Sequence, residues 1–526
     1  MRDGSIEFVF DGDPGARPDV VQAITGGNGS SYSVNDDGPA RRLRRTWLDT
    51  FDWRLYRAGL ALEQVAVSGR TELVLTGRDG ARLAIQSADA ANGSHKSIGW
   101  PALLGALPPG PLRELLEPVV GVRALAPIAR AVSQVRQHRV LNSDAKTVAR
   151  LAVDQMSVTY PARATAAPRL SVSAVRGYPA QASRLSARLA KAPGIWPGGA
   201  SALDAALAAA GSQPAARIGV VQLAAGMPAV TALAAILTAL LDTAEANVRG
   251  TIRDIDTEFL HDLRVAIRRT RSVLKLAGRT LPGDLAARYR PEFRWLGELT
   301  APTRDLDVYL LGFDDMTAGL VAATGAELAP FRQYLVRARG AAHRELARGL
   351  RSARFARLTG QWRTALAEVR PTRKRPAVAQ LAGQRIAAAQ RRALRAGQRI
   401  TAVSAAEDLH DLRKDCKELR YLVEMFGSLY DPAQRWQAVR ELKALQDCLG
   451  EFQDVEVQRA EIHAFADRML AERSAPAATL LAMGEIAAGL ARRQQQARIE
   501  FDGRFAAFAG EASQARLTAL TQVAGA

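Results

Sequence analysis

The chain has 526 residues, which is too long for one ordinary hydrophobic core, so we expect about two to four domains. Its formal net charge of +18 favours an anionic partner and argues against an acidic or neutral surface. Two cysteines, Cys416 and Cys448, are too few for a disulfide framework and have no metal-site spacing, which fits a reducing cytoplasm. The N-terminal stretch MRDGSIEFVFDGD lacks an apolar run, so we expect no signal peptide.

The first part of the chain is rich in predicted β-strands. Residues 65–86 contain β-branched stretches broken by Ser-Gly and Asp-Gly, which is typical of an antiparallel meander. Residues 147–160 and 169–178 alternate in the same way, and short helices are predicted over 111–118 and 181–191. Pro, Gly and Ala then dominate residues 192–217. The pattern predicts an α+β domain over 1–200 and a linker over 201–227.

Residues 218–241 carry no charge and are long enough to cross a membrane. Gln222, Gly226 and Pro228 interrupt the segment, and Pro228 suits the first turn of a helix that continues past Asp242. We therefore expect a buried helix of a water-soluble domain and no membrane contact.

Long amphipathic helices follow from residue 229 onward. They are predicted over 229–247, 255–277, 284–300, 303–313, 325–350, 352–368, 377–399, 404–427, 432–449, 453–472 and 476–507. Short connections between long helices favour antiparallel bundles. We expect one bundle over 228–380 and a second over 381–520.

One pattern occurs twice in this helical part, 149 residues apart. Basic residues follow a histidine at offsets 3, 7 and 10, and acidic residues follow it at offsets 44 and 46. The first copy has His261, Arg264, Arg268, Arg271, Asp305 and Asp307, and the second has His410, Arg413, Lys417, Arg420, Asp454 and Glu456. Fixed offsets predict duplicated helical units that face one site.

Helical geometry places each set of basic residues in a stripe. At about 100° per residue, Arg264, Arg268 and Arg271 fall within about 80° of His261, beside the apolar face. Like charges three or four residues apart repel, so such a stripe favours an anionic ligand. A solvated surface with scattered arginines is the alternative for a single helix, and the repetition argues against it.

Neither histidine has an adjacent partner for a catalytic dyad, because neighbours along a helix do not face each other. Asp305 and Asp307 likewise do not share a helical face, so a two-carboxylate metal site is not expected. Asp305 and Asp454 are predicted to orient arginines of the stripes or to cap a helix. A larger cationic surface of second rank is predicted from Arg337, Arg339, Arg344, Arg348, Arg351, Arg354, Arg385, Arg392, Arg395 and Arg399.

Residues from about 228 to 520 resemble the CHAD family, the conserved histidine α-helical domain. The resemblance rests on HDLRVAIRRTR (261–271), LGELTAPTRDLDV (296–308), HDLRKDCKELRY (410–421) and LGEFQDVEV (449–457). It implies two four-helix bundles related by pseudo-twofold symmetry, a basic channel between them, and binding of inorganic polyphosphate at polyphosphate granules. The family's functional residues map onto His261, Arg264, Arg268, Arg271, His410, Arg413, Lys417 and Arg420.

The N-terminal region resembles the CYTH family, which has a triphosphate-tunnel fold. The matching stretch is TWLDTFDWRLYRAGLAL (46–62), which includes Arg57. The resemblance implies an antiparallel β-barrel or tunnel. Catalytic members open with an ExExK strand, whereas this chain has only Glu7 there, and Glu63-Gln64-Val65 replaces an expected basic strand. Since a triphosphatase needs several carboxylates for its metal, we expect no metal and no turnover from this domain.

These observations predict a cytoplasmic, non-enzymatic polyphosphate-binding protein without a cofactor, associated with polyphosphate granules. A triphosphatase or polyphosphatase is the enzymatic alternative. A nucleic-acid-binding protein is a third possibility, but aromatic residues for base stacking are scarce beside the stripes, Tyr421 being an exception. A scaffold without ligand would remain if charge reversal at Arg264 and Arg413 left polyphosphate affinity unchanged.

Overall fold

The chain forms two compact units, Met1–Arg217 and Ile218–Ala526. A computed structural model describes residues 6–10, 21–22, 24–26, 32–88, 98–198, 201–214, 221–278, 280–370 and 376–522. The boundary between the units falls inside the segment 201–227 that the sequence predicts as a linker. Each unit is described by itself.

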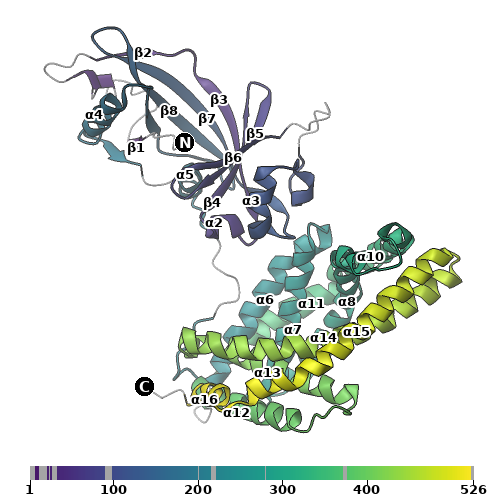
Figure 1. The fold of residues 1–526 in the computed structure, drawn as a ribbon. Helices are drawn as coiled ribbons and strands as arrows, with labels where there is room; N and C mark the ends of the chain where they lie inside the picture. The colour runs from purple at the N-terminus through teal and green to yellow at the C-terminus, as the bar shows by residue number, and fades with distance from the viewer. Residues whose placement is uncertain are drawn as a thin grey trace. The chain divides into compact units, whose positions relative to one another are not determined.

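An antiparallel sheet is the centre of the first unit (Figure 1). Its strands run in the order β11-β1-β10-β8-β7-β3-β4-β5-β6, with β2 paired to β7 and β9 to β8. The strands are β1 (Ile6–Phe10), β2 (Ser33–Asp36), β3 (Arg41–Thr50), β4 (Leu60–Val67), β5 (Arg70–Gly77), β6 (Arg82–Ser87), β7 (Leu125–Leu141), β8 (Thr147–Tyr160), β9 (Ala164–Thr165), β10 (Arg169–Ala174) and β11 (Ile195–Pro197).

The α+β antiparallel fold predicted for this region is confirmed. The sheet is open, because its end strands β6 and β11 do not pair with each other within the described residues. A barrel closed by hydrogen bonds, which the CYTH resemblance implies, is therefore not formed. The meander predicted over 65–86 corresponds to β4, β5 and β6, which pair as antiparallel neighbours with a register shift in β5 between Leu75 and Thr76.

Helices cover both faces of this sheet. Helix α3 (Pro111–Val120) packs on leucines of β3, β4 and β5, and α4 (Pro179–Leu189) packs on β8 and β10. Side chains alternate between the faces of a strand, so Trp47 points away from its neighbour Leu48. Helix α5 (Ala202–Ala209) packs against Trp47 on that opposite face. Residues 202–209 are thus a packed helix and not linker, while residues 215–220 of the expected linker lie outside the described residues.

The second unit is helical, as predicted. Its helices are α6 (Ala229–Arg253), α7 (Thr257–Ala277), α8 (Leu285–Leu311), α9 (Phe313–Ala318), α10 (Ala329–Leu350), α11 (Ala353–Ala367), α12 (Val378–Gly397), α13 (Ala406–Met425), α14 (Pro432–Ala471), α15 (Ala477–Ala509) and α16 (Glu511–Ala519). In the first half, α6, α7, α8 and α10 pack in a ring. In the second half, α12, α13 and α14 pack in sequence, and α15 with α16 completes the ring.

The two halves share one hydrophobic core. A continuous cluster of buried side chains runs from Leu223 to Leu520 and includes residues of α6, α7 and α8 as well as α12, α13 and α14. A second cluster joins α8 and α10 to α14 and α15. Residue 380 therefore does not separate two independent cores.

Two predicted helix ends are wrong. The expected break between 300 and 303 does not occur, since α8 continues through Pro302 as well as Pro291. The expected break near 450 does not occur either, because α14 is one helix of 40 residues. Proline removes one backbone hydrogen bond, but burial of α8 against α7 and α10 outweighs that local loss.

Helix α6 has the length and composition of a membrane span, with a mean hydropathy of 1.5 in its most apolar window. More than half of that window (56%) is buried inside the protein. Leu233, Leu237 and Leu241 belong to the shared core. The length and hydropathy of α6 are those that a buried core helix also shows.

Candidate functional site

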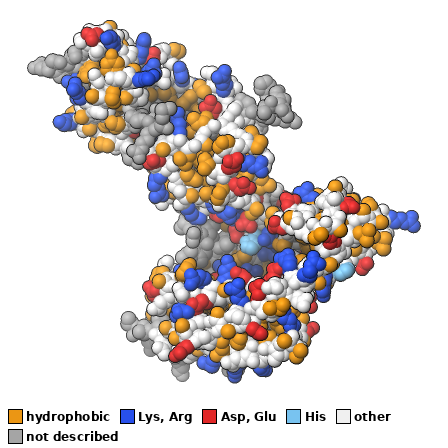
Figure 2. Space-filling model, in the orientation of Figure 1, with side chains coloured by type: hydrophobic (Ala, Val, Ile, Leu, Met, Phe, Trp, Pro, Cys, Tyr) orange, Lys and Arg blue, Asp and Glu red, His pale blue; other side chains and the backbone are white. Residues whose placement is uncertain are grey.

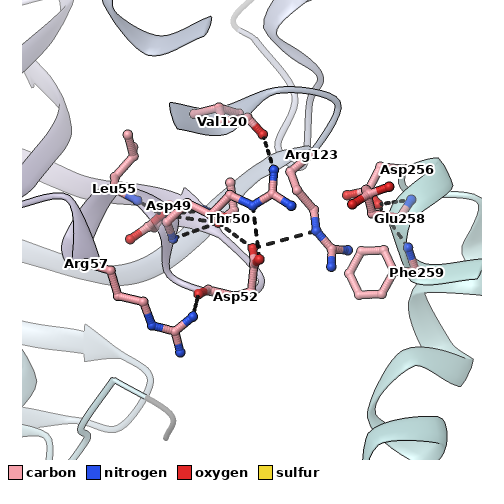
Figure 3. A network of polar contacts seen from close by, with 11 residues as sticks. Asp49, Thr50, Asp52, Leu55, Arg57, Val120, Arg123, Asp256, Glu258 and Phe259 are labelled. Carbon is pink, nitrogen blue, oxygen red and sulfur yellow. Dashed lines mark hydrogen bonds and ion pairs between the residues drawn. The ribbon is translucent and has the colours of Figure 1, made fainter. Parts of the chain in front are cut away.

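Helix α7 carries the first histidine and its basic stripe. Asp256 begins the helix, because its Oδ1 accepts hydrogen bonds from the backbone N–H groups of Glu258 (3.0 Å) and Phe259 (3.2 Å), as Figure 3 shows. Leu263 and Ile267 are buried, whereas Arg268 and Arg271 are exposed. The predicted amphipathic face is therefore confirmed.

Helix α13 repeats this arrangement. Its apolar face is buried through Leu409, Leu412, Cys416, Leu419 and Val423. His410, Arg413, Lys417 and Arg420 are only partly exposed. The residues of the second stripe are thus more buried than Arg268 and Arg271 of the first stripe.

The two stripes meet where α7 and α13 cross. Arg269 on α7 pairs with Glu424 on α13 (Nη2–Oε2 2.9 Å), and Lys275 pairs with Glu418 (Nζ–Oε2 3.1 Å). The residue number rises along α7 as it falls along α13, so the helices run antiparallel. The first and last residues of each stripe are ten positions apart, or about 15 Å at 1.5 Å per residue.

The antiparallel crossing brings the two stripes together. We call the eight residues the basic row: His261, Arg264, Arg268 and Arg271 on α7, and His410, Arg413, Lys417 and Arg420 on α13. Arg268 and Arg420 meet at one side chain, since the guanidinium carbon of each lies 5.5 Å from the ring centre of Tyr421. Figure 2 shows Lys and Arg side chains gathering where the helical unit is hollowed, with Asp and Glu side chains among them.

The lowered pKa of Lys417 shows that positively charged residues of the row lie close together. Burial lowers the pKa of its ammonium to about 8, and Arg413, Arg268 and Arg420 act in the same direction, while Asp454 opposes them. Arg268 comes from α7 and the other two arginines from α13. The row therefore has a concentrated positive field that a bound anion would relieve.

Two carboxylates support arginines of the row, as the sequence predicted. Asp454 accepts from Nη2 of Arg413 through both oxygens, at 2.8 and 2.9 Å. Asp305 lies 3.9 Å from Nη2 of Arg264. The alternative that these carboxylates cap helices is wrong, because both lie inside long helices, α8 and α14.

Arg264 has additional partners on α8. Its Nη1 donates to Thr300 Oγ1 at 3.2 Å and to the backbone carbonyl of Gly297 at 3.5 Å. Burial lowers the pKa of Arg264, and Arg268 and Arg304 add to that effect. The side chain is therefore held in place before any ligand arrives.

Asp307, the second member of the first acidic pair, belongs to another network. It is buried and pairs with Arg339 of α10 (Nε–Oδ1 2.6 Å), and Arg339 also binds Asp254 (Nη2–Oδ1 2.6 Å). This network ties α8 and α10 to the connection between α6 and α7. Arg339, a second-rank candidate for the cationic surface, is thus a structural ion-pair partner.

The Leu-Gly steps before the acidic pairs make room for arginines. A Cβ on Gly297 would lie 3.0 Å from Arg271 Nη1, and a Cβ on Gly450 would lie 3.5 Å from Arg413 Nη2. The steps are not at equivalent positions, since Gly297 precedes Asp305 by eight residues and Gly450 precedes Asp454 by four. Relative to the acidic pairs the two glycines differ by about one helical turn, and each makes room for a different arginine of the row.

The histidines lie at the two ends of the row. Burial lowers the pKa of His261, and the charges of Arg304 and Arg268 add to the effect against Glu258 and Asp262. The Nδ1 atom of His410 is buried without a hydrogen-bond partner in the described part of the chain. Neither imidazole forms an ion pair with a carboxylate there, so no catalytic dyad is assembled.

Sequence reasoning missed two residues of this site and one contact across it. Arg304 lowers the pKa of both His261 and Arg264, although the sequence shows it only as the first letter of RDLD. Glu424 lies between Arg269 and Arg420, at 2.9 and 3.5 Å. Tyr421 is the last residue of the second motif, and the sequence gives no sign that Arg268 reaches it from the other half.

Several second-rank arginines are engaged in ion pairs. Arg392 pairs with Asp415 and Glu418, Arg354 with Glu292, and Arg348 with Glu345. The broad cationic surface expected from them is therefore partly neutralised.

The first unit holds its own polar network around Asp49. This buried carboxylate accepts from the backbone N–H groups of Thr50, Leu55 and Tyr56 at 2.7–2.9 Å, and so fixes the turn into α2 (Arg54–Arg57). Arg57 donates to the backbone carbonyl of Asp52 (Figure 3). The stretch that resembles the CYTH family thus holds the turn between β3 and α2 in place through the hydrogen bonds of Asp49.

The sheet face that carries Trp47 holds arginines paired with carboxylates. Arg45 binds Glu63 and also Asp154, with Nη1–Oδ2 at 3.0 Å. Arg169 binds Glu7, the one carboxylate left from the family's metal-binding strand. Across the described residues, no group of three or more His, Cys, Asp or Glu side chains is placed to hold a metal ion.

The CHAD domain model matches residues 235–463. These residues form a CHAD domain. It contains all eight residues of the basic row and both acidic pairs. A search of curated proteins finds no match.

Solved structures give three further likenesses. The CHAD domain from the plant Ricinus communis is 25% identical, with 55% of this chain and 96% of that chain covered and a TM-score of 0.46. PptA from Streptomyces chartreusis is 21% identical, with 53% and 99% covered and a TM-score of 0.42. A proposed adenylate cyclase from Vibrio parahaemolyticus is 8% identical, with 36% and 87% covered and a TM-score of 0.21. The family assignment rests on the family match and the motifs, since each TM-score is below 0.5.

Proposed function

We propose that the CHAD domain binds inorganic polyphosphate along the basic row and does not turn it over. The observation that carries the proposal is the antiparallel crossing of α7 and α13. It brings two cationic stripes, each about 15 Å long at 1.5 Å per helical residue, into one row. A flexible polyanion with a charge on every phosphate suits such a row.

The mechanism is charge-assisted hydrogen bonding with counterion release. Guanidinium groups donate in a planar fork that suits phosphoryl oxygens, and such bonds are stronger than those between neutral groups. Arg268 and Arg271 are exposed and offer their donors directly to a ligand. Because each bound phosphate displaces counterions, the affinity is expected to fall steeply with salt.

The engagement of Tyr421 favours polyphosphate over nucleic acid. Single-stranded nucleic acids gain affinity by stacking bases on aromatic rings. Tyr421 is the aromatic residue that the sequence places beside the row, and Arg268 and Arg420 already lie over its ring. Polyphosphate has no base and needs no such platform.

The surroundings of the histidines favour binding over hydrolysis. A general base is usually held and activated by a hydrogen-bonded partner, and neither His261 nor His410 has one among the described residues. Protonated imidazoles at the two ends of the row would instead donate to phosphoryl oxygens. Association with polyphosphate granules in the cytoplasm would follow from such binding.

A titration of the full chain with long-chain polyphosphate at several salt concentrations tests the proposal. We expect Arg268→Gln with Arg271→Gln to weaken binding and to reduce the salt slope by roughly 0.7–0.9 for each phosphate that is no longer neutralised. The matched control is Arg357→Gln with Lys443→Gln, which removes the same charge from exposed positions on α11 and α14 outside the row. Equal losses of affinity in both variants, or binding independent of salt, would contradict the proposal.

Two further measurements separate the alternatives. Long-chain polyphosphate should displace single-stranded DNA or RNA from the protein, and nucleic acid should not displace polyphosphate. Phosphate release from polyphosphate with added magnesium or manganese would support the enzymatic alternative. If no phosphate is released and the protein is folded, binding remains the proposed function.

A further inference from the structure

An aromatic side chain lies between the two stripes of the basic row, and it belongs to the last residue of the second histidine motif. Tyr421 is partly exposed and lies where α7 and α13 cross. Arg268 approaches its ring from α7, and Arg420 approaches it from α13, each with its guanidinium carbon 5.5 Å from the ring centre. Tyr421 therefore contacts one arginine from each half of the row.

The two arginines differ in what else holds them. Arg420 also pairs with Glu424 (Nε–Oε1 3.5 Å). The guanidinium of Arg268 has no hydrogen bond or ion pair with any described residue, and its approach to the ring is the interaction that fixes its direction. Without the ring, the repulsion from Arg264 and Lys417 would turn this exposed side chain away from the row.

The ring can hold both cations because its faces are electron-rich. A guanidinium over an aromatic face is attracted to the ring quadrupole. This attraction also limits the freedom that a long side chain would otherwise lose when a ligand binds. Arg268 is thus ready for a phosphate before one arrives.

We propose that Tyr421 is the positioning residue that joins the two halves of the row and gives it a preference for long polyphosphate chains. The proposal rests on the polyphosphate-binding function. A short chain such as tripolyphosphate fits within one half, of about 15 Å, and does not need the junction. A long chain crosses the junction and needs Arg268 and Arg420 directed along one line.

The test compares long-chain polyphosphate with tripolyphosphate on the full chain. We expect Tyr421→Leu to weaken long-chain binding by about five- to thirtyfold, the factor that 1–2 kcal/mol represents. Tripolyphosphate binding should change by less than about twofold, and Tyr421→Phe should keep long-chain affinity because it keeps the ring face. Thermal unfolding of each variant verifies the fold.

Two controls make the result specific. Trp436→Leu removes an exposed aromatic ring on α14 that Arg440 covers at 4.8 Å outside the row, and it should leave both affinities unchanged. The effects of Tyr421→Leu and Arg268→Gln on affinity should be less than additive, because both remove the same interaction. Full additivity, or equal weakening of long and short chains, would overturn the inference. Absence of binding by the unaltered protein would instead contradict the polyphosphate function.

Discussion

Lys417 links the basic row to pH. Arg413 and Arg420 from its own helix, Arg268 from α7 and Asp454 from α14 surround it, and burial with the three arginines lowers its pKa to about 8. An unfolded chain would keep the proton up to the ordinary pKa of 10.5. Between these values the unfolded state binds more protons, so the contribution of Lys417 to stability rises with pH from about 8 to 10.5. A bound polyanion stabilises the protonated ammonium of Lys417 and therefore raises its pKa.

Polyphosphate binding is therefore expected to take up a proton at Lys417. Affinity should fall as the pH rises from 7 to 9, and Lys417→Arg should flatten this dependence because arginine stays charged. Calorimetric titration at pH 8, in two buffers with different ionisation enthalpies, measures the proton uptake. Lys443→Arg, at an exposed position on α14, is the matched control. Unchanged proton uptake in Lys417→Arg would rule out Lys417 as its source.

Arg339 is the residue on which the ion-pair network behind the row depends. Its partner Asp307 is almost fully buried, and burial raises the pKa of Asp307 despite the arginine. Hydrogen bonds from Arg339 lower the pKa of Asp254 at the end of α6. Loss of Arg339 would leave a buried carboxylate without a partner.

Arg339→Met is expected to destabilise the protein by about 3–5 kcal/mol, the usual cost of removing one partner of a buried pair. Adding Asp307→Asn should recover part of that stability, because it removes the stranded charge. Urea unfolding of the full chain measures both. Arg348→Met, which removes the exposed pair with Glu345, should cost no more than about 1 kcal/mol. Equal effects at the two positions would show that the Arg339 network is not structural.

At the scale of helices, the packing of α6 on α7 depends on a glycine. A Cβ on Gly250 would lie 2.2 Å from the ring of Phe259, which is itself buried. Phe259 lies in the first turn of α7, so this close approach positions the beginning of the histidine helix. A larger residue would push α7 away from α6.

Gly250→Ala is expected to cost about 1–3 kcal/mol of unfolding free energy through overpacking. Gly484→Ala on α15 is the matched control, since nothing lies within 4 Å of its added Cβ. Alanine there should stabilise the helix by up to about 1 kcal/mol, because it is the better helix former. Stabilisation by both changes in thermal unfolding would show that the packing of α6 on α7 adjusts freely.

The periodicity of the sequence predicts which faces of α7 and α13 are buried, because burial depends on residue spacing within one helix. The angle at which the helices cross depends on pairs of distant residues, such as Arg269 with Glu424, and no local pattern contains it. For the same reason, the sequence did not predict that α8 continues through Pro302 or that α14 continues through Gly450. Local signals for helix ends were overridden there by packing against neighbouring helices.

At the scale of the whole molecule, the shared core of the helical unit explains how two repeats form one site. Buried side chains of α6, α7 and α8 pack in the same cluster as those of α12, α13 and α14. The halves therefore cannot tilt independently without breaking core packing. A fixed crossing keeps the spacing between the two stripes constant, which suits a ligand with regularly spaced charges.

The sheet of the first unit pairs its arginines with carboxylates. The face that carries Trp47 has Arg45 bound to Glu63 and Asp154, and Arg169 bound to Glu7. Helix α5 packs against Trp47 on that face. A divalent ion would have to displace an arginine to reach these carboxylates, and a triphosphate would have to displace a carboxylate to reach these arginines.

We therefore expect the full chain to release no phosphate from tripolyphosphate in the presence of magnesium or manganese. Ion pairs within the sheet, of which Arg45 with Glu63 is largely buried, oppose both the metal and the anion, because each must break a pair before it can bind. A phosphate-release assay over several hours, with a known triphosphatase as positive control, measures this. Arg268→Gln with Arg271→Gln should leave the result unchanged, since the row is not involved. Metal-dependent turnover that Glu7→Gln abolishes would contradict the prediction and assign the activity to the sheet.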